Sequence, residues 1–467
     1  MNKDKSSSAE ALVLPIALLL YILLSGFVTY YDLRVFINWS SIVDKTGLFG
    51  IYRASELLGY AYRVVYPPLA PLMFIASYDA VRGAISTLTL SFSGLGAATL
   101  KQFIVPFIER ILLKTPLMTS ALALWRVVRR AYGRETSALI LLGPPVLFVI
   151  ALYNFDLPMI LFAMASLTLL HRGRRRLSAI LFSASVLSKQ ASIILLPVLL
   201  VHVYRKWGGR AVLEYLGITA LTTSIVLAPF IAASGPALAK WMVEFQETRP
   251  PQGPSISTAV YVLSGYKETS LLSLTETVST LLTVILIAYT LYLYLRRGGG
   301  LWNLTVSSAA VFTVLLAFSK VVNPVYTLWG YPFIAVLAAR DKRMNRLFWA
   351  YIAASIVVYI WFFSLYSSAL ITSSPAYLYE ERRWVGYSEL VAMLRGSMGP
   401  YGLFLDLLLL IARSNHLLWS MASIMYQGWG IATALMAATY TMLMVYVYLG
   451  LLRGLEASQS SSRRSLA

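Results

Sequence analysis

Long apolar stretches alternate with short polar segments through most of the chain. A run of about twenty apolar residues spans the hydrocarbon core of a bilayer as one helix. The pattern therefore predicts an all-α, polytopic membrane protein with about twelve transmembrane helices. The predicted spans are residues 11–29, 115–131, 136–153, 155–171, 177–190, 191–204, 211–233, 271–295, 302–321, 324–340, 346–367 and 426–452.

Three of these spans carry additional expectations. Residues 11–29 lack a small-residue cleavage site and are expected to remain as an uncleaved helix. Spans 177–190 and 191–204 are too short to cross a bilayer upright, so we expect a broken hairpin. Its turn at Ser188-Lys189-Gln190 would lie in protein or in a water-filled cavity, because irregular backbone is not tolerated in lipid.

The chain between the first two spans, residues 30–114, is only moderately hydrophobic. We interpret it as a long first outer loop with interfacial helices at residues 41–58 and 72–82, where Tyr, Trp and Arg suit headgroup depth. Residues 83–107 are apolar but rich in Ser, Thr and Gly. This composition favours a surface or re-entrant segment over a full crossing.

Two further outer segments, residues 234–270 and 368–425, separate later spans of what we expect to be a single transmembrane domain, residues 1–467. The second holds an apolar stretch, residues 401–412, that either lies flat or pairs with its neighbours. The serine-rich end, residues 457–467, is predicted to be a disordered cytoplasmic tail.

Basic residues gather at alternate ends of the predicted spans, as is typical of cytoplasmic loops. Placing these clusters in the cytoplasm also places both termini there, and the number of crossings is then even. The protein is expected in the plasma membrane or the endoplasmic reticulum membrane, with its functional face external or lumenal. The clusters are Arg126, Arg129, Arg130 and Arg134; Arg172, Arg174, Arg175 and Arg176; Arg205, Lys206 and Arg210; Arg296 and Arg297; and Arg340, Lys342, Arg343 and Arg346.

Composition agrees with this interpretation and excludes several classes of function. Hydrophobic residues make up 58% and charged residues 13% of the 467 residues, which is too few polar groups for a water-soluble surface. The net charge of +19 resides in the short loop clusters, so we reject nucleic acid as a partner. With no cysteine and only three histidines, we expect no metal site and no cofactor.

Ionisable residues at the outer ends of the spans are the candidates for chemistry, because they are expensive to hold near hydrocarbon. Asp32 follows the first span, and a partly desolvated carboxylate can act as a general base. Lys189, with Arg34 or Lys320, could stabilise an anionic leaving group such as a phosphate. No phosphate-binding glycine loop and no Ser/His/Asp arrangement offers another mechanism.

At these residues the chain resembles the GT-C fold of polyprenyl-phosphate-sugar-dependent glycosyltransferases, most nearly the ALG-type glucosyltransferases and GPI mannosyltransferases. Four patches in the expected order carry the resemblance. They are Asp32 with Trp39 and Tyr66-Pro67-Pro68-Leu69; Asn154-Phe155-Asp156; Ser188-Lys189-Gln190-Ala191 with Leu196-Pro197; and Phe318 to Pro324 with Tyr326, Trp329 and Pro332.

The resemblance implies an inverting transfer of a hexose, mannose or glucose, from a polyprenyl or dolichyl phosphate to a lipid-linked glycan or another acceptor. Asp32 would be the general base, and no metal or cofactor would be needed. The family's second acid is replaced by Arg34, which puts a metal-binding Asp-x-Asp pair in doubt. The donor phosphate would be held by Lys189, Gln190, Arg34 and Lys320, with Trp39, Tyr66, Asp156 and Asn323 as substrate-binding or supporting residues.

Alternatives remain open for each candidate and for the whole chain. Asp32 could merely solvate a helix end, Asp156 could cap the following helix, and Lys189 or Lys320 could be an interfacial lysine. Trp39 and Tyr66 fit an aromatic belt as well as a sugar site. A transporter or lipid-linked sugar flippase, or a scaffold subunit, would use the same composition. The lack of an internal repeat and the gathering of polar residues at one face disfavour transport.

Overall fold

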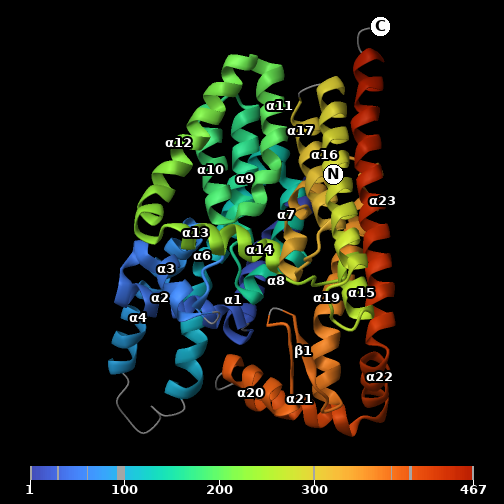
Figure 1. Ribbon diagram of the computed structural model, residues 1–467. Coiled ribbons are helices and arrows are strands. Elements are labelled where there is room, and N and C mark those ends of the chain that lie inside the picture. Colours follow the sequence, from blue (N-terminus) through green and yellow to red (C-terminus); the bar gives the residue numbers. More distant parts are fainter. Residues whose placement is uncertain are drawn as a thin grey trace. The chain divides into compact units, whose positions relative to one another are not determined.

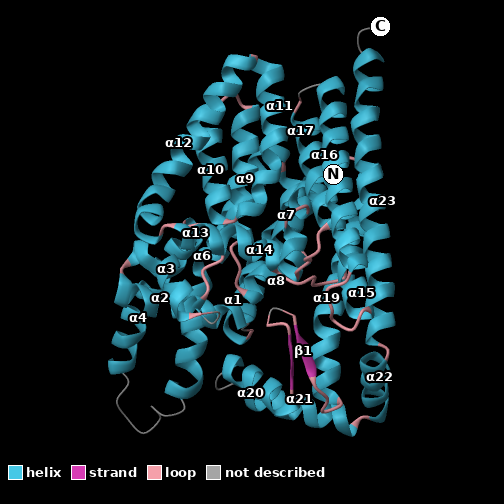
Figure 2. Cartoon of the chain, viewed as in Figure 1, coloured by secondary structure: helices cyan, strands magenta, loops and turns pink. Residues whose placement is uncertain are grey.

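The protein is described from a computed structural model, covering residues 3–28, 31–59, 62–91, 100–297, 300–379, 381–398 and 402–464. Helices account for nearly all of these residues, which confirms an all-α membrane-type chain (Figure 1, Figure 2). In the described part of the chain, six helices are long and apolar enough to cross a membrane, or seven if one bent pair counts as a span. Several of the predicted spans instead form shorter or broken helices.

The chain divides into two compact units. The first unit comprises Met1–Ile193, Leu213–Thr248 and Gly396–Gly402; the second comprises Ile194–Val212, Arg249–Arg395 and Leu403–Ala467. Short 3-10 or π turns occur at Leu48–Gly50, Leu100–Ile104, Gln190–Leu195, Lys240–Glu244, Pro324–Leu328 and Lys342–Met344.

In the first unit, α9 packs against α6 and α10, and its side chains supply much of the buried core. Helix α1 packs along α6, and α2 packs on α3 and α4. The helices of this unit are α1 (Lys3–Phe27), α2 (Tyr31–Thr46), α3 (Ile51–Leu58), α4 (Leu69–Ser91), α6 (Val105–Tyr132), α7 (Arg134–Leu142), α8 (Pro144–Leu152), α9 (Asp156–His171), α10 (Arg175–Ser188), α12 (Gly209–Ser234), α13 (Pro236–Ala239) and α14 (Phe245–Thr248).

The second unit is built around α17, which is buried over most of its length and packs on α16 and α23. One departure from all-helical structure is an antiparallel hairpin in which Tyr377 pairs with Trp384. Its elements are α11 (Leu196–Trp207), α15 (Ile256–Leu263), α16 (Ser270–Arg297), α17 (Leu301–Phe318), α18 (Tyr331–Arg340), α19 (Asn345–Ile371), β1 (Ala376–Leu378), β2 (Arg383–Val385), α20 (Tyr387–Met398), α21 (Gly402–Ser414), α22 (His416–Gln427) and α23 (Trp429–Arg464).

Several predicted boundaries need correction. The span at residues 136–153 is broken into α7 and α8 at Gly143, because Pro144 and Pro145 begin a new helix and cannot continue the old one. The helix expected at residues 41–58 is instead α2 followed by α3, separated by a turn at Gly47 with φ of 74°.

The rest of the first loop is more helical than expected. Helix α4 covers the predicted 72–82 helix and continues to Ser91, and α6 begins at Val105, so helix replaces much of the expected surface segment 83–107. Part of that prediction, residues 92–99, lies outside the described residues.

The C-terminal part of the chain also differs from expectation. Helix α23 continues to Arg464, past the predicted start of a disordered tail at Ala457, because no Pro or Gly follows Gly454 to end it. The apolar stretch 401–412 falls in α21, and the segments Leu405–Ser414 and His416–Gln427 form a helix pair bent by 96°.

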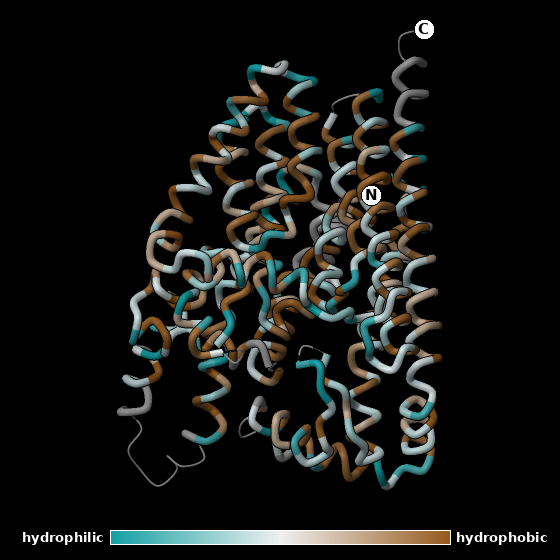
Figure 3. Tube along the Cα trace, in the orientation of Figure 1, coloured by the Kyte–Doolittle hydropathy of each residue, from teal (hydrophilic) through white to brown (hydrophobic). Residues whose placement is uncertain are grey.

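Apolar side chains on the outer surface indicate where lipid contacts the helices. Leu213 and Leu221 on α12 are 71% and 63% exposed, and Leu274 and Ile285 on α16 are both 59% exposed. Figure 3 shows the apolar residues along these helices. Exposed apolar side chains of this number need a hydrocarbon neighbour, which a bilayer supplies.

Two glycines let α23 closely approach the start of α19 and the 3-10 turn Lys342–Met344 that precedes it. A Cβ at Gly450 would overlap the Leu347 side chain, and a Cβ at Gly454 would overlap Met344. The spacing of four residues places both glycines on one face of α23. Small residues at this spacing are typical of tightly packed membrane helices, where close backbone contact replaces the hydrophobic effect.

We expect Gly450→Val to destabilise the protein by about 1–3 kcal/mol, because the added side chain must displace Leu347. Thermal unfolding of the purified protein in detergent measures the effect. Gly217→Val on α12 is the matched control, since nothing lies within 4 Å of a Cβ at that position. Equal melting temperatures for the two variants would contradict the close-packing account.

Candidate functional site

Asp32 and Arg34 lie in the first turn of α2 and not in an extended loop as expected. An aspartate in the first turn of a helix is stabilised by the helix dipole, which accounts for its place there. The side chains of both residues are outside the described part of the structure. Phe36 and Trp39 follow Asp32 by four and seven residues and so share its face of α2, and both are anchored in protein at 2% and 0% exposed.

An aromatic cluster joins α2 to the start of α9; we define it as Phe36, Trp39, Tyr66 and Phe155. Trp39 stacks on Phe155 with ring centroids 6.1 Å apart and an interplanar angle of 14°. Phe36 lies 5.3 Å from Phe155 and 5.8 Å from Tyr66, centroid to centroid. The indole N–H of Trp39 donates to the Arg63 carbonyl at 2.9 Å. Trp39 is fully buried, so it packs in the protein interior and does not lie in an aromatic belt at the membrane surface.

Beside this cluster lies a buried ion pair between Lys189 and Asp156. The Lys189 ammonium donates to both carboxylate oxygens of Asp156 at 2.8 Å, and lies 3.4 Å from Asn154 Oδ1. Lys189 is 6% exposed and Asp156 is 0% exposed. The Tyr66 hydroxyl approaches the same Asn154 oxygen at 3.4 Å, and the ammonium sits 5.7 Å from the centre of the Tyr66 ring. Residues from three separate sequence patches therefore meet at one place.

The helix termini at which Asp156 and Lys189 lie stabilise their charges. Asp156 is the first residue of α9, and Lys189 is the C-cap of α10. A carboxylate at a helix N-terminus and an ammonium at a C-terminus both oppose the helix dipole. The N-cap residue of α9 is Phe155, and Asp156 is the acidic residue of the first turn. Its two carboxylate oxygens accept hydrogen bonds from the Lys189 ammonium.

The pair changes what Lys189 can do for an anion. Its positive charge is already balanced by Asp156, so a phosphate must compete with that carboxylate for the ammonium N–H groups. The hydrogen bond from the Lys189 ammonium to Asn154 is longer than its two bonds to Asp156, and is therefore the weakest of the three. Gln190 also has a protein partner, because its amide donates to the Met242 carbonyl at 3.4 Å.

Lys114 is a buried residue that the sequence did not single out. Its ammonium donates to the carbonyl oxygens of Val28 at 2.7 Å and Ala151 at 2.6 Å, and the residue is 0% exposed. Val28 directly follows α1, and Ala151 lies in the last turn of α8. Lys114 thus connects the segment between α1 and α2 to the end of α8, just before the Asn154 turn.

Lys320 and Asn323 belong to the second unit. Lys320 lies 3.6 Å from the Glu276 carboxylate, and Asn323 is the N-cap of the 3-10 turn Pro324–Leu328. The backbone of this patch pairs with Gln252, whose N–H donates to the Lys320 carbonyl at 2.9 Å and whose carbonyl accepts from Val322 at 2.8 Å. Gly253 has φ of 84°, and a Cβ there would overlap the Val322 carbonyl, so glycine is required.

Arg249 is a second buried cation that the sequence did not single out. It is 8% exposed and donates to Gln252 Oε1 at 2.9 Å and to the Tyr326 hydroxyl at 3.2 Å. Tyr326 stacks on Trp329 with ring centroids 4.3 Å apart. The fourth sequence patch, Phe318 to Pro324 with Tyr326 and Trp329, is therefore held in place by Arg249 and the residues that follow it, up to Gly253. Among the described residues, no group of three His, Asp or Glu side chains is arranged to hold a metal ion.

We expect Lys189→Met to destabilise the protein by about 3–5 kcal/mol, because it leaves the Asp156 carboxylate buried without its cation. Asp156→Leu should be similarly harmful, for the converse reason. The double variant should recover most of the lost stability, since an apolar pair of similar volume replaces both charges. Thermal unfolding of the four proteins in detergent gives the cycle. Additive losses in the double variant would mean that the two charges do not depend on each other.

Comparison with known proteins leaves the function to be argued from these residues. No protein-family model matches the chain, and no curated protein matches it. The geometry of the first unit and the order of the four sequence patches are therefore the basis for a functional assignment.

Proposed function

We propose that the protein is an inverting hexosyltransferase that uses a polyprenyl-phosphate-linked sugar at a membrane surface. The observation that supports this most directly is the convergence of Tyr66, Asn154, Asp156 and Lys189 next to the helix that carries Asp32. These residues come from three of the four sequence patches that resemble GT-C enzymes. If these three patches had no shared role, we would not expect the fold to place them in contact.

In the proposed reaction, the Asp32 carboxylate takes a proton from the acceptor hydroxyl. The hydroxyl oxygen then attacks the anomeric carbon from the side opposite the phosphate, and the bond from that carbon to the phosphate oxygen breaks. The electron pair leaves on the phosphate oxygen. A single displacement of this kind inverts the anomeric carbon, and the products are the glycosylated acceptor and polyprenyl phosphate.

Lys189 is assigned to the leaving phosphate, which gains a negative charge as the bond breaks. Because Asp156 already binds the ammonium, Lys189 must share its N–H groups between the carboxylate and the phosphate. The N–H group directed at Asn154 is the one we expect it to release, since that bond is the longest. Asp156 then keeps the ammonium in place, while Arg34 and Gln190 of the same unit are further candidates for the phosphate. Mannose or glucose is the expected sugar, and a lipid-linked glycan the expected acceptor.

Replacing Asp32 by Asn should reduce hexose transfer by about 10²- to 10⁴-fold, the range typical of a lost general base. The measurement is transfer of labelled mannose or glucose from a polyprenyl phosphate to lipid-linked glycan, with protein in liposomes. Asp44→Asn is the matched control, because Asp44 lies on the same helix and is 63% exposed beside Arg82. Equal activity of the Asp32 variant and wild type would reject the role. Movement of the intact lipid-linked sugar between leaflets, without a new glycosidic bond, would indicate a flippase.

The double variant Lys189→Met with Asp156→Leu separates catalysis from folding. We expect it to fold and to bind donor weakly, with hexose transfer reduced by about 10²-fold or more, because no ammonium remains for the leaving phosphate. The same liposome assay, run beside a thermal melt, provides the measurement. Wild-type transfer rates in a well-folded double variant would show that Lys189 has only a structural role.

A further inference from the structure

The segment that follows α12 contacts the candidate site of the first unit. Gly235, with φ of 53°, and Pro236 end α12 and turn the chain into α13, the π turn Lys240–Glu244 and α14 (Figure 1). The Lys240 ammonium lies 2.8 Å from the Glu56 carboxylate on α3, and α13 packs on the same helix. These contacts hold the segment in place within the first unit.

Gln190 joins this segment to the turn that carries the buried ion pair. It directly follows Lys189, and its side-chain amide donates to the Met242 carbonyl at 3.4 Å. Met242 lies in the middle of the π turn, next to Trp241. Turns of this type are rare and are frequently found at functional sites. Trp241 is therefore one residue away from a direct contact with the Lys189 turn.

Two side-chain atoms at this contact are buried and have no hydrogen-bond partner among the residues that the structure describes. They are the indole nitrogen of Trp241 and Oε1 of Gln190. Burying a polar group without a partner costs free energy, so such groups need an explanation. The indole N–H can only donate, and the amide oxygen can only accept. A hydroxyl group does both, so it could satisfy either atom.

The orientation of Trp241 does not suit an aromatic belt. A tryptophan at a membrane interface presents its N–H to headgroups or water and its ring to lipid. The Trp241 side chain is partly exposed, but its nitrogen is buried, so the N–H edge of the ring is turned into the protein. The ring also lies 6.0 Å from Phe245, centroid to centroid. The N–H group is thus directed to a ligand within the protein and not to the bilayer.

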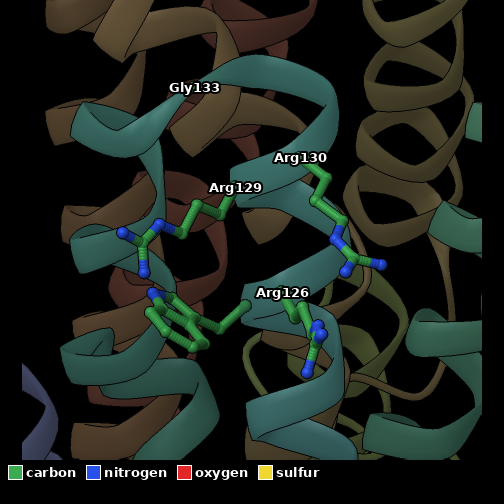
Figure 4. Close-up of a pocket in the computed structure, with 5 residues that line it drawn as sticks. Arg126, Arg129, Arg130 and Gly133 are labelled. Carbon is green, nitrogen blue, oxygen red and sulfur yellow. The ribbon is translucent and has the colours of Figure 1, made fainter.

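A cavity of about 480 Å³ at the C-terminal end of α6 is too far away to share this ligand. Arg172, which follows α9, donates to the Arg130 carbonyl at 3.2 Å, so the cavity lies beside the C-terminal end of α9. The Lys189–Asp156 pair is at the other end of that helix, a rise of about 22 Å away. The arginine side chains of the cavity also point in different directions (Figure 4). Its lining residues are Trp125, Arg126, Arg129, Arg130 and Gly133.

We propose that Trp241 and Gln190 recognise the hexose of the lipid-linked donor. Trp241 donates its indole N–H to one sugar hydroxyl, and Gln190 Oε1 accepts a hydrogen bond from a hydroxyl of the same sugar. Oε1 does not suit a phosphate oxygen, because both atoms are acceptors. The hexose adjoins the phosphate in the donor, as Gln190 adjoins Lys189 in the chain. This inference rests on the proposed hexosyltransferase function and adds to it the residues that bind the sugar.

The test compares full-length protein in detergent for binding of polyprenyl phosphate with and without an attached mannose or glucose. Trp241→Phe should weaken binding of the hexose-bearing lipid about tenfold, the effect of one lost hydrogen bond, and leave binding of polyprenyl phosphate unchanged. Gln190→Met should reduce the preference for the hexose-bearing lipid in the same way. Trp241→Phe should also keep the wild-type melting temperature, because the N–H that it removes bonds to none of the described residues.

Two controls separate recognition of the sugar from a general effect of the substitution. Trp349→Phe removes the same group from a side chain on α19 that is 62% exposed, and its affinities should equal those of wild type. Donors that each lack one hydroxyl identify the bonded group. Wild type should bind one of them about tenfold more weakly than the complete donor, whereas Trp241→Phe should bind the two equally well.

Three results would overturn the inference. A wild-type preference for the hexose-bearing lipid in Trp241→Phe would show that the indole does not bind the sugar, while hexose transfer by wild type would leave the proposed function intact. A lower melting temperature of Trp241→Phe would show that its N–H already has a structural role. Equal affinity of wild type for the two lipids would exclude recognition of the hexose. Absence of transfer in the liposome assay would, in contrast, reject the hexosyltransferase itself.

Discussion

The buried ion pair between Lys189 and Asp156 is the interaction on which the first unit depends. Neither charge can be buried alone without a large loss of stability, so the start of α9 and the end of α10 must come together. The Asn154 turn and the aromatic cluster then pack around the pair and keep water from it. A polar arrangement of this kind fixes one geometry for three chain segments, which is what a site that positions reacting groups requires.

Helices with an uninterrupted apolar pattern could be predicted closely from the sequence, as α9, α12 and α16 show. The prediction was wrong at residues 136–153, where Gly143 and two prolines outweigh the apolar run. Tyr66, Asp156 and Lys189 were recognisable because ionisable or polar groups stand out among apolar neighbours. Their pairing was not predictable, since Lys189 and Asp156 are 33 residues apart and only helix packing brings them together.

The buried cations that the sequence did not reveal share one property. Each occurs in a sequence context that more commonly indicates an exposed residue. A single lysine near the end of an apolar segment, such as Lys114, usually reaches for the headgroups. An arginine before two prolines, such as Arg249, looks like part of an exposed loop. In both cases the deciding fact is which oxygen atoms lie within reach of the side chain, and that depends on folding.

Lys114 has a consequence for how such a chain can change during evolution. Its two partners are backbone carbonyl oxygens, at Val28 and Ala151, and every amino acid carries this group. Substitutions at those two positions therefore leave the acceptors in place, whereas loss of the lysine removes both contacts at once. A connection of this type produces no correlated substitutions. Methods that infer spatial proximity from paired sequence changes would not detect it, although it joins two segments of the first unit.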